Sequence, residues 1–327
     1  MQIKNPNLPQ WKQILRQNFT DPNKLADFLL LSSQQRETIL SRPRFILNLP
    51  LRLANKIVKG DMEDPILKQF LPTTHESHSS NGFVNDPVGD SECRIGRKLL
   101  HKYNGRVLLV TTSSCAMHCR YCFRQKFDYE VEQNGFADEL QLISQDESIN
   151  EVILSGGDPL SLDDRVLENL LNHLSNIPHI RKIRFHTRFP IGIPERIDES
   201  FLSLLSRVPK QIWFVIHVNH PHELDPDILA SLKSIQRLGI PVLNQSVLLK
   251  GINDNAETLI QLCSTLVDHG IFPYYLHQLD RVQGTAHFEV DEACGKELIQ
   301  TISTQLPGYA VPKFVREIPG MPSKTPQ

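Results

Sequence analysis

The 327-residue sequence lacks the features that mark several common classes of protein. Its longest apolar runs, such as residues 28–31 and 107–110, fall far short of the roughly 20 residues that a membrane-spanning helix needs. The first residues, MQIKNPNLPQWKQ, contain no apolar segment of the kind that directs export. A net charge of −2 predicts no general attraction to nucleic acid or anionic lipid. We therefore expect a cytoplasmic protein that binds neither nucleic acid nor membranes.

Cysteine is also scarce. The chain has six cysteines, too few for a disulfide framework in a cytoplasmic protein of this length. Three of them lie close together in the stretch SSCAMHCRYCF, as Cys115, Cys119 and Cys122, and the others are scattered at positions 93, 263 and 294. This distribution predicts one metal or redox site and three cysteines without a role in it.

The composition is that of a globular protein, with 40% hydrophobic and 22% charged residues. The length suggests one large domain with an appendage, or two smaller domains. Residues 1 to about 60 have helical periodicity, and residues 60–95, rich in Pro, Asp, Ser and Gly, are expected to form an extended connector.

A regular alternation of short β-branched runs and amphipathic stretches begins near Arg106. Strands are expected at residues 107–112, 152–154, 183–186, 212–218, 242–248 and 272–276. Helices are expected near residues 136–146, 163–175, 195–206, 226–238 and 255–269. Such alternation predicts right-handed βαβ units and a parallel sheet, which either curls into a partial barrel or stays open.

In either form, the chemistry of such a sheet belongs in the loops after the carboxyl ends of its strands. The cysteine cluster directly follows the first expected strand, and Ser155, Gly156, Gly157 and Asp158 directly follow the second. Both segments should therefore open onto one face of the sheet and contribute to one site. The paired glycines would permit a close approach of the backbone to a small ligand.

The cysteine spacing, C-x3-C-x2-C, offers three thiolates from a single loop. Zinc sites more often combine two C-x2-C arms, and no other cysteine in this sequence has a near partner. Three thiolates instead suit three corners of a cubane iron–sulfur cluster, which would leave the fourth iron open. A zinc knuckle and buried unligated thiols are the alternatives.

This loop, with Tyr121 before its last cysteine, resembles the signature of the radical S-adenosylmethionine (SAM) enzymes. The resemblance implies a [4Fe–4S] cluster held by Cys115, Cys119 and Cys122, with SAM on the open iron as the source of a 5′-deoxyadenosyl radical. It implies SAM contacts from the segment 155–158 and from two residues at strand ends, His217 and Gln245.

The same resemblance implies an α/β fold, a partial (βα)6 TIM-like barrel with a helical N-terminal extension. We expect the extension and connector in residues 1–95 and the barrel in residues 96–290. A C-terminal helix, a strand and a tail would then occupy residues 291–327.

The tail, EIPGMPSKTPQ, resembles the Pro-Gly-rich loop of lysine 2,3-aminomutases, a family of radical SAM enzymes. In that family the lysine that stands here as Lys324 forms a Schiff base with pyridoxal 5′-phosphate (PLP). The family's basic residues for the PLP phosphate correspond to Lys102 and Arg106, although the first of these is usually arginine. The chemistry needs a lysine amine that can lose its proton.

The resemblance also identifies residues for a substrate. Arg124 corresponds to the arginine that pairs with the substrate carboxylate, a contact suited to a bidentate fork. Asp280 and Glu317 correspond to an acidic pair that holds the distal ammonium, although the second member is usually aspartate. Two carboxylates directed at one site favour a substrate with a distal positive charge, because they repel each other unless a cation lies between them.

The sequence stops three residues after Lys324, as in the elongation factor P beta-lysylation branch of the family. This likeness implies conversion of (S)-α-lysine to (R)-β-lysine for modification of elongation factor P, with an electron donor such as flavodoxin or ferredoxin. No cysteine follows Cys294, so we expect no structural zinc site of the kind found in longer family members. The alternatives are an aminomutase for another amino acid, a radical SAM enzyme of another reaction class, and a non-enzymatic iron–sulfur or zinc protein.

Overall fold

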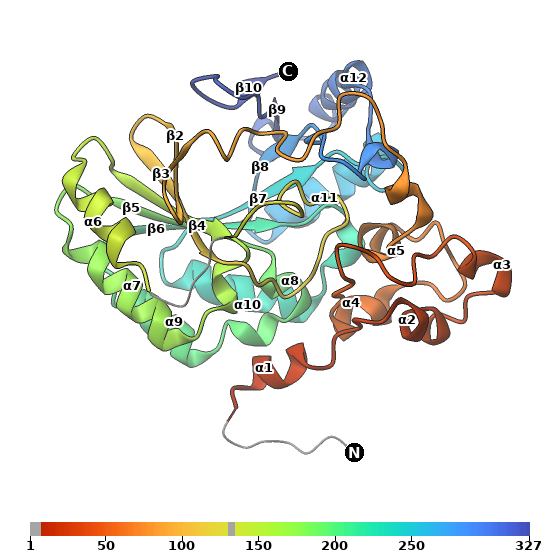
Figure 1. The fold of residues 1–327 in the computed structure, drawn as a ribbon, viewed down its shortest axis with the longest axis horizontal. Coiled ribbons are helices and arrows are strands. Elements are labelled where there is room, and N and C mark those ends of the chain that lie inside the picture. Colours follow the sequence, from red (N-terminus) through yellow and green to blue (C-terminus); the bar gives the residue numbers. More distant parts are fainter. Residues whose placement is uncertain (1–7, 130–134) are drawn as a thin grey trace.

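The computed structural model describes residues 8–129 and 135–327. One sheet of ten strands, arranged in sequence order, forms the centre of the molecule (Figure 1). The strands are β1 (Arg94–Gly96), β2 (Leu99–Tyr103), β3 (Arg106–Thr112), β4 (Glu151–Gly156), β5 (Lys182–Thr187), β6 (Gln211–His217), β7 (Val242–Val247), β8 (Phe272–His277), β9 (Lys313–Arg316) and β10 (Thr325–Pro326).

The six expected strands, β3 to β8, pair in parallel, and β9 extends the parallel run by one strand. Helices follow the strands as the periodicity predicted: α6 (Ala137–Gln145), α7 (Asp164–Asn176), α9 (Glu199–Ser206), α10 (Pro226–Arg237) and α11 (Ala256–Asp268). In α7 the buried leucines fall at positions 167, 170, 171 and 174, a spacing that places one apolar stripe against the sheet. The fold is therefore the expected partial barrel.

The two ends of this barrel come together through side chains. The Tyr103 hydroxyl in β2 donates a hydrogen bond of 2.6 Å to Glu317, which directly follows β9. Gly89 packs so closely on Pro319 that a Cβ built on the glycine would lie 3.2 Å from the proline Cβ. The sheet thus curls until the segment after its last parallel strand contacts its second strand.

The structure corrects one expectation for the region before the first parallel strand and adds two strands that were not predicted. The segment 60–95 contains helix α5 (Pro65–Phe70) as well as irregular chain, because Asp64 caps the helix through the backbone amides of Ile66 and Leu67. The first parallel strand is preceded by two antiparallel strands, β1 and β2, so residues 99–103 belong to the sheet. Their short length and mixed burial obscure the twofold pattern by which a strand is recognised.

The N-terminal region consists of short helices that pack on the barrel (Figure 1). They are α1 (Gln10–Leu15), α2 (Pro22–Phe28), α3 (Ser33–Arg36) and α4 (Leu51–Lys56). Trp11, Leu25 and Leu53 belong to the same buried cluster as the strands and helices of the barrel. The N-terminal region and the barrel therefore share one hydrophobic core.

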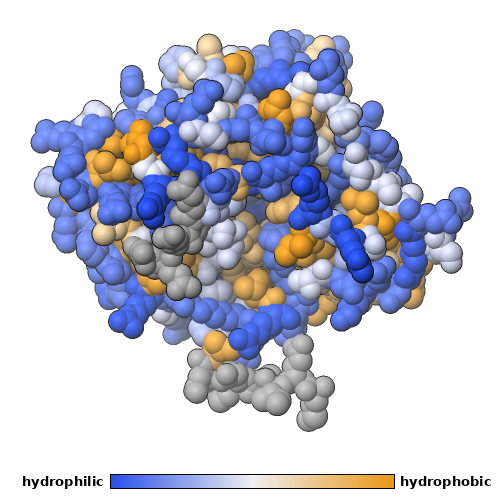
Figure 2. All heavy atoms as spheres, viewed as in Figure 1, coloured by the Kyte–Doolittle hydropathy of each residue, from blue (hydrophilic) through white to orange (hydrophobic). Residues whose placement is uncertain are grey.

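The C-terminal helix α12 (Glu292–Ser303) packs on β9 through Gly295, since a Cβ there would lie 2.3 Å from the Phe314 ring. On the face shown in Figure 2, hydrophobic residues form separate spots within a mostly hydrophilic surface. Within residues 8–129 and 135–327, no helix is both long and apolar enough to cross a bilayer.

Candidate active site

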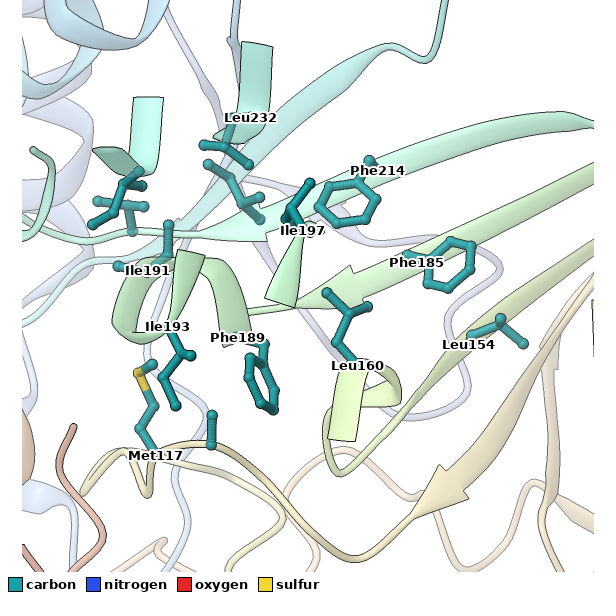
Figure 3. Close-up of a cluster of buried hydrophobic side chains, with 14 of the residues drawn as sticks. Met117, Leu154, Leu160, Phe185, Phe189, Ile191, Ile193, Ile197, Phe214 and Leu232 are labelled. Carbon is teal, nitrogen blue, oxygen red and sulfur yellow. The ribbon is translucent and has the colours of Figure 1, made fainter. Parts of the chain in front are cut away.

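The loop that carries the three clustered cysteines leaves the carboxyl end of β3 and is anchored in the core. Ala116 and Met117 between the first two cysteines are buried, and Met117 points into a cluster with Phe189 and Ile193 (Figure 3). A Cβ on Gly192 would lie 2.6 Å from the Met117 methyl carbon, so the packing here is tight. This apolar anchor fixes the backbone between Cys115 and Cys119 in the core.

The N-terminal region holds the same loop through polar contacts. Asn48 donates to the Cys115 carbonyl at 3.0 Å, and Asn18 donates to the Ala116 carbonyl at 2.7 Å. Further along the loop, the Arg120 Nε donates to Glu76 at 2.8 Å. Because Arg120 is 1% exposed, this buried ion pair fixes the loop to the segment before the barrel.

The three thiols lie close enough to influence one another. Burial, together with the neighbouring charges of Asp158 and the other two thiols, raises the pKa of Cys115 well above its ordinary value. Burial and Cys119 raise the pKa of Cys122 to about 11. A metal that binds here must displace the protons of Cys115 and Cys122, as metals do at ligating cysteines. No three His, Cys, Asp or Glu side chains in the described chain converge on a position for a single metal ion.

The glycine-rich segment after β4 lies directly against the cysteine loop. The Gly157 amide donates to the Thr112 carbonyl at 2.7 Å, and the Asp158 amide donates to the Ser114 carbonyl at 2.8 Å. A Cβ on Gly157 would lie 2.5 Å from the Ser114 carbonyl oxygen. The glycine is thus required by the close approach of the two loops, and the two segments do meet at one end of the barrel.

The Asp158 carboxylate faces the protein rather than an open site. It accepts hydrogen bonds from the Thr187 hydroxyl at 2.7 Å and from the backbone amides of Leu160, Arg188 and Phe189. These four donors occupy the lone pairs of the Asp158 carboxylate, which therefore holds the loops after β4 and β5 together. Among the segment's other groups, the Gly156 carbonyl accepts from the Tyr129 hydroxyl at 3.0 Å, and the Ser155 carbonyl accepts from Thr111.

His217 and Gln245 are paired at adjacent positions of β6 and β7, and His217 lies beside the cysteine loop. The His217 ring nitrogen Nε2 lies 3.0 Å from the Tyr121 hydroxyl, and the two rings stack. Burial lowers the pKa of His217 well below its ordinary value, so the ring is neutral. His217 therefore contacts the aromatic residue of the cysteine motif directly.

The C-terminal tail returns to the barrel and places Lys324 beside an acid. The Lys324 Nζ lies 2.5 Å from the Glu317 Oε2, and the same carboxylate accepts from Tyr103 and lies 3.5 Å from the Lys102 Nζ. Burial alone would raise the pKa of Glu317, but the charges of Lys324 and Lys102 lower it overall. The ammonium lies 6.0 Å from the centre of the Tyr275 ring.

Asp280, after β8, belongs to the same group of charges. Burial raises the pKa of its carboxyl to about 7, with the positive charge of Lys324 opposing the shift and the negative charge of Glu317 adding to it. Its side chain makes no hydrogen bond within residues 8–129 and 135–327, which leaves the carboxyl available. The two expected acids and the expected Schiff-base lysine are thus brought together.

Lys102 and Arg124 are joined by an acid that sequence reasoning missed. Asp90 is 1% exposed and lies 2.6 Å from the Lys102 Nζ and 2.7 Å from the Arg124 Nε. Arg124 makes no other hydrogen bond in the part of the chain that is described, so the far edge of its guanidinium remains open. Arg106 stacks on Tyr103 at 4.7 Å and has no acidic partner among the described residues.

The side chains around the cysteine loop and Lys324 suit the groups that the resemblance implies. Three thiols on one loop, two of which have a pKa raised by burial, suit an iron–sulfur cluster, whose ligands must be deprotonated on binding. The unpaired cation Arg106 suits a phosphate, since Tyr103 and Glu317 connect it to Lys324. The buried Nε2 of His186 in β5 has no partner in the described chain, as expected where a polar ligand is to bind. The residues present therefore fit the groups.

Besides Asp90, the sequence reasoning missed Arg188, whose guanidinium contacts Cys119 and Tyr121. It directly follows β5, so the rule that located the cysteine loop at a strand end would have identified it. Asp90 carried no such signal, because it lies in a Pro- and Gly-rich segment far from any parallel strand.

Comparisons with known proteins agree with this fold. A family described as the Radical SAM superfamily matches residues 109–263. The chain is 39% identical, over 99% of its length and 96% of the relative's, to L-lysine 2,3-aminomutase of Escherichia coli. It is 40% identical, over 96% of its length and 94% of the relative's, to L-lysine 2,3-aminomutase of Haemophilus influenzae. The fold also resembles that of SuiB of Streptococcus suis bound to S-adenosylmethionine, with a TM-score of 0.50, 16% identity and coverage of 66% of this chain and 51% of SuiB.

The parallel partial barrel, with its three-cysteine loop after the first parallel strand, defines a radical SAM protein. This class implies a [4Fe–4S] cluster and S-adenosylmethionine. Within it, the chain belongs to the L-lysine 2,3-aminomutase family, as the near full-length relatives show. It is therefore an enzyme, an isomerase.

Proposed function

We propose that this enzyme is a PLP-dependent radical SAM 2,3-aminomutase that converts (S)-α-lysine to (R)-β-lysine. The observation that carries the proposal is the convergence of Lys324, Glu317 and Asp280 at the end of the barrel where the cysteine loop lies. An amine able to bind PLP and two carboxylates thereby share one site, and the relatives named above are lysine 2,3-aminomutases.

The acidic pair supports a substrate with a distal ammonium. Asp280 has a raised pKa because burial and Glu317 both disfavour its charge, and a cation between the two acids would relieve this cost. In the structure, the Lys324 ammonium supplies that charge to Glu317. A lysine substrate would present the same group, an ammonium on a flexible alkyl chain. A glutamate substrate would place a third carboxylate here.

The cofactors have residues suited to hold them. We assign Cys115, Cys119 and Cys122 to the cluster, with SAM bordered by the loop 155–158, His217 and Gln245. Lys324 would hold PLP, and Arg106 with Lys102 would face its phosphate. The cluster with SAM would supply a hydrogen-abstracting radical, and PLP would supply a conjugated ring that delocalises an unpaired electron.

The remaining roles belong to side chains of the barrel. Arg124 would fix the substrate carboxylate through its open edge, while Asp90 holds the other edge and the orientation of the fork. Lys324 must lose its proton to react, and the nearby rings of His186 and His277 are neutral because burial, with the charge of Lys324 adding to it, lowers their pKa. No group in this arrangement needs to activate water.

Anaerobic reconstitution with iron, sulfide, SAM, PLP and a reductant, followed by chromatography of the products from lysine, tests the proposal. We expect β-lysine from lysine and no product from glutamate. A product from another amino acid, with none from lysine, would refute lysine as the substrate. A protein that binds zinc and no iron would refute the reaction class.

We further propose that the β-lysine serves modification of elongation factor P in the cytoplasm, with flavodoxin or ferredoxin as electron donor. The support is the resemblance of the sequence to the elongation factor P beta-lysylation branch of the family. Addition of purified elongation factor P and its lysine-attaching enzyme to the reaction would test this. The mass of the factor should increase by one β-lysyl residue only when the aminomutase is active.

A further inference from the structure

One of the three cysteine sulfurs receives a hydrogen bond from a charged side chain. The Arg188 Nη1 lies 2.8 Å from the Cys119 Sγ, which stands here for the thiolate that would ligate the cluster. Within residues 8–129 and 135–327, no charged side chain donates a hydrogen bond to Cys115 or Cys122, although the charges of Arg124 and Arg120 also act on Cys122. The electrostatic environment of the three cysteines is therefore unequal.

Arg188 is held in place from its far side. Its Nη2 donates to Glu223 at 2.6 Å and to Gln69 at 2.7 Å, and it is 7% exposed, whereas both acceptors are completely buried. The Glu223 carboxylate is itself fixed by Gln69 and by the backbone amides of Asn219 and His220. The guanidinium therefore cannot turn away from the cysteine without leaving buried polar groups unpaired.

The ion pair of Arg188 and Glu223 has its positive charge beside the Cys119 sulfur and its negative charge on the far side. A cation that donates to a ligating thiolate stabilises the more negative, reduced state of an iron–sulfur cluster. A carboxylate on the far side of that cation opposes the effect, because its charge disfavours the added electron. Since both groups are buried, water screens these interactions little.

From this geometry we propose that Arg188 is a positioning and tuning residue that raises the reduction potential of the cluster, and that Glu223 moderates it. The proposal rests on the proposed cluster site, but not on the identity of the amino-acid substrate. Electron transfer to the cluster must precede cleavage of SAM, so the ion pair would set how strong a reductant the enzyme requires.

The test is the midpoint potential of the reconstituted cluster, followed by electron paramagnetic resonance during a redox titration, with and without SAM. Glu223→Gln should shift the potential to more positive values. Arg188→Met combined with Glu223→Gln should shift it to more negative values than Glu223→Gln alone. The midpoint potential of Arg188→Lys, which keeps the charge, should lie closer to that of the wild type than the potential of the double variant does.

Arg52→Met is the matched control, because Arg52 binds Glu195 and Asp225 and contacts no cysteine. Its potential should equal that of the wild type. Equal potentials for Glu223→Gln and the double variant, with normal iron content, would overturn the inference. If the double variant binds no iron, an unchanged potential in Glu223→Gln alone overturns it. A wild type without iron would instead refute the proposed function.

Discussion

The amine of Lys324 lies 2.5 Å from the Oε2 of Glu317, so the group proposed to bind PLP is paired with a carboxylate proposed to bind substrate. The two residues are only seven apart, on a tail that folds back over the end of β9. Covalent attachment of Lys324 to PLP would draw the amine away from this partner. Glu317 would then be left to accept the distal ammonium of a substrate.

Replacement of Lys324 by alanine should abolish the covalent attachment of PLP while the iron content stays normal. The reason is that the variant loses the reactive amine but keeps all three cysteines. Borohydride reduction followed by mass spectrometry would detect the linkage, and iron analysis would report the cluster. Lys313→Ala, at an exposed position of β9, is the control and should retain the linkage. PLP still linked to the protein in Lys324→Ala would show that another lysine is used.

Glu317→Gln should raise the KM for lysine roughly ten- to hundredfold, since a hydrogen bond to a charged group contributes about 1.5–3 kcal/mol. Cluster assembly should be unaffected, and PLP should be kept saturating while the steady-state rates are measured. Glu289→Gln removes an acid from a more exposed ion pair with Arg281 and should leave the KM unchanged. An unaltered KM in Glu317→Gln would remove the acidic pair from substrate recognition.

Asp280→Asn should stabilise the substrate-free protein above pH 7. In the folded protein the pKa of this carboxyl is about 7, raised by burial and Glu317 and Asp90 against the charges of Lys324 and Lys102. In the unfolded chain it is near 4. The folded state therefore holds the proton more tightly, and wild-type stability falls as the pH rises from about 4 to about 7. Thermal unfolding across this range should show that the unfolding temperature of the variant exceeds that of the wild type by an amount that grows with pH. A difference that does not change with pH would contradict the raised pKa of Asp280.

Gly157→Ala should destabilise the junction of the cysteine loop and the loop after β4, because the new Cβ would lie 2.5 Å from one backbone oxygen and 2.7 Å from another. Overpacking of this kind costs about 1–3 kcal/mol, and backbone atoms have little freedom to move aside. We expect a lower unfolding temperature and less bound iron. Gly308→Ala, where a Cβ meets nothing within 4 Å, should match the wild type in both. Normal iron binding by Gly157→Ala would mean that the cysteine loop and the loop after β4 can move apart without loss of the iron site.

Much of the fold could be predicted because its signals are local and repeated. The strands β3 to β8 alternate with amphipathic helices, and the period of each pattern reports the face that is buried. The strands β1 and β2 gave no such signal, since they are short and partly exposed. Helix α5 was missed because the Pro and Asp that suggested a connector also begin a helix, as N1 and N-cap.

The sequence by itself determined the order of the strands, the loop with three thiols and the residue types in the tail, because each is a property of neighbours along the chain. Only the tertiary structure decided which distant groups meet. Asp90 joins Lys102 to Arg124, Arg188 reaches Cys119 from another strand end, and Glu317 closes the barrel against Tyr103. These contacts depend on the curvature of the sheet and on the burial of charges, and neither is encoded in the spacing of residues along the chain.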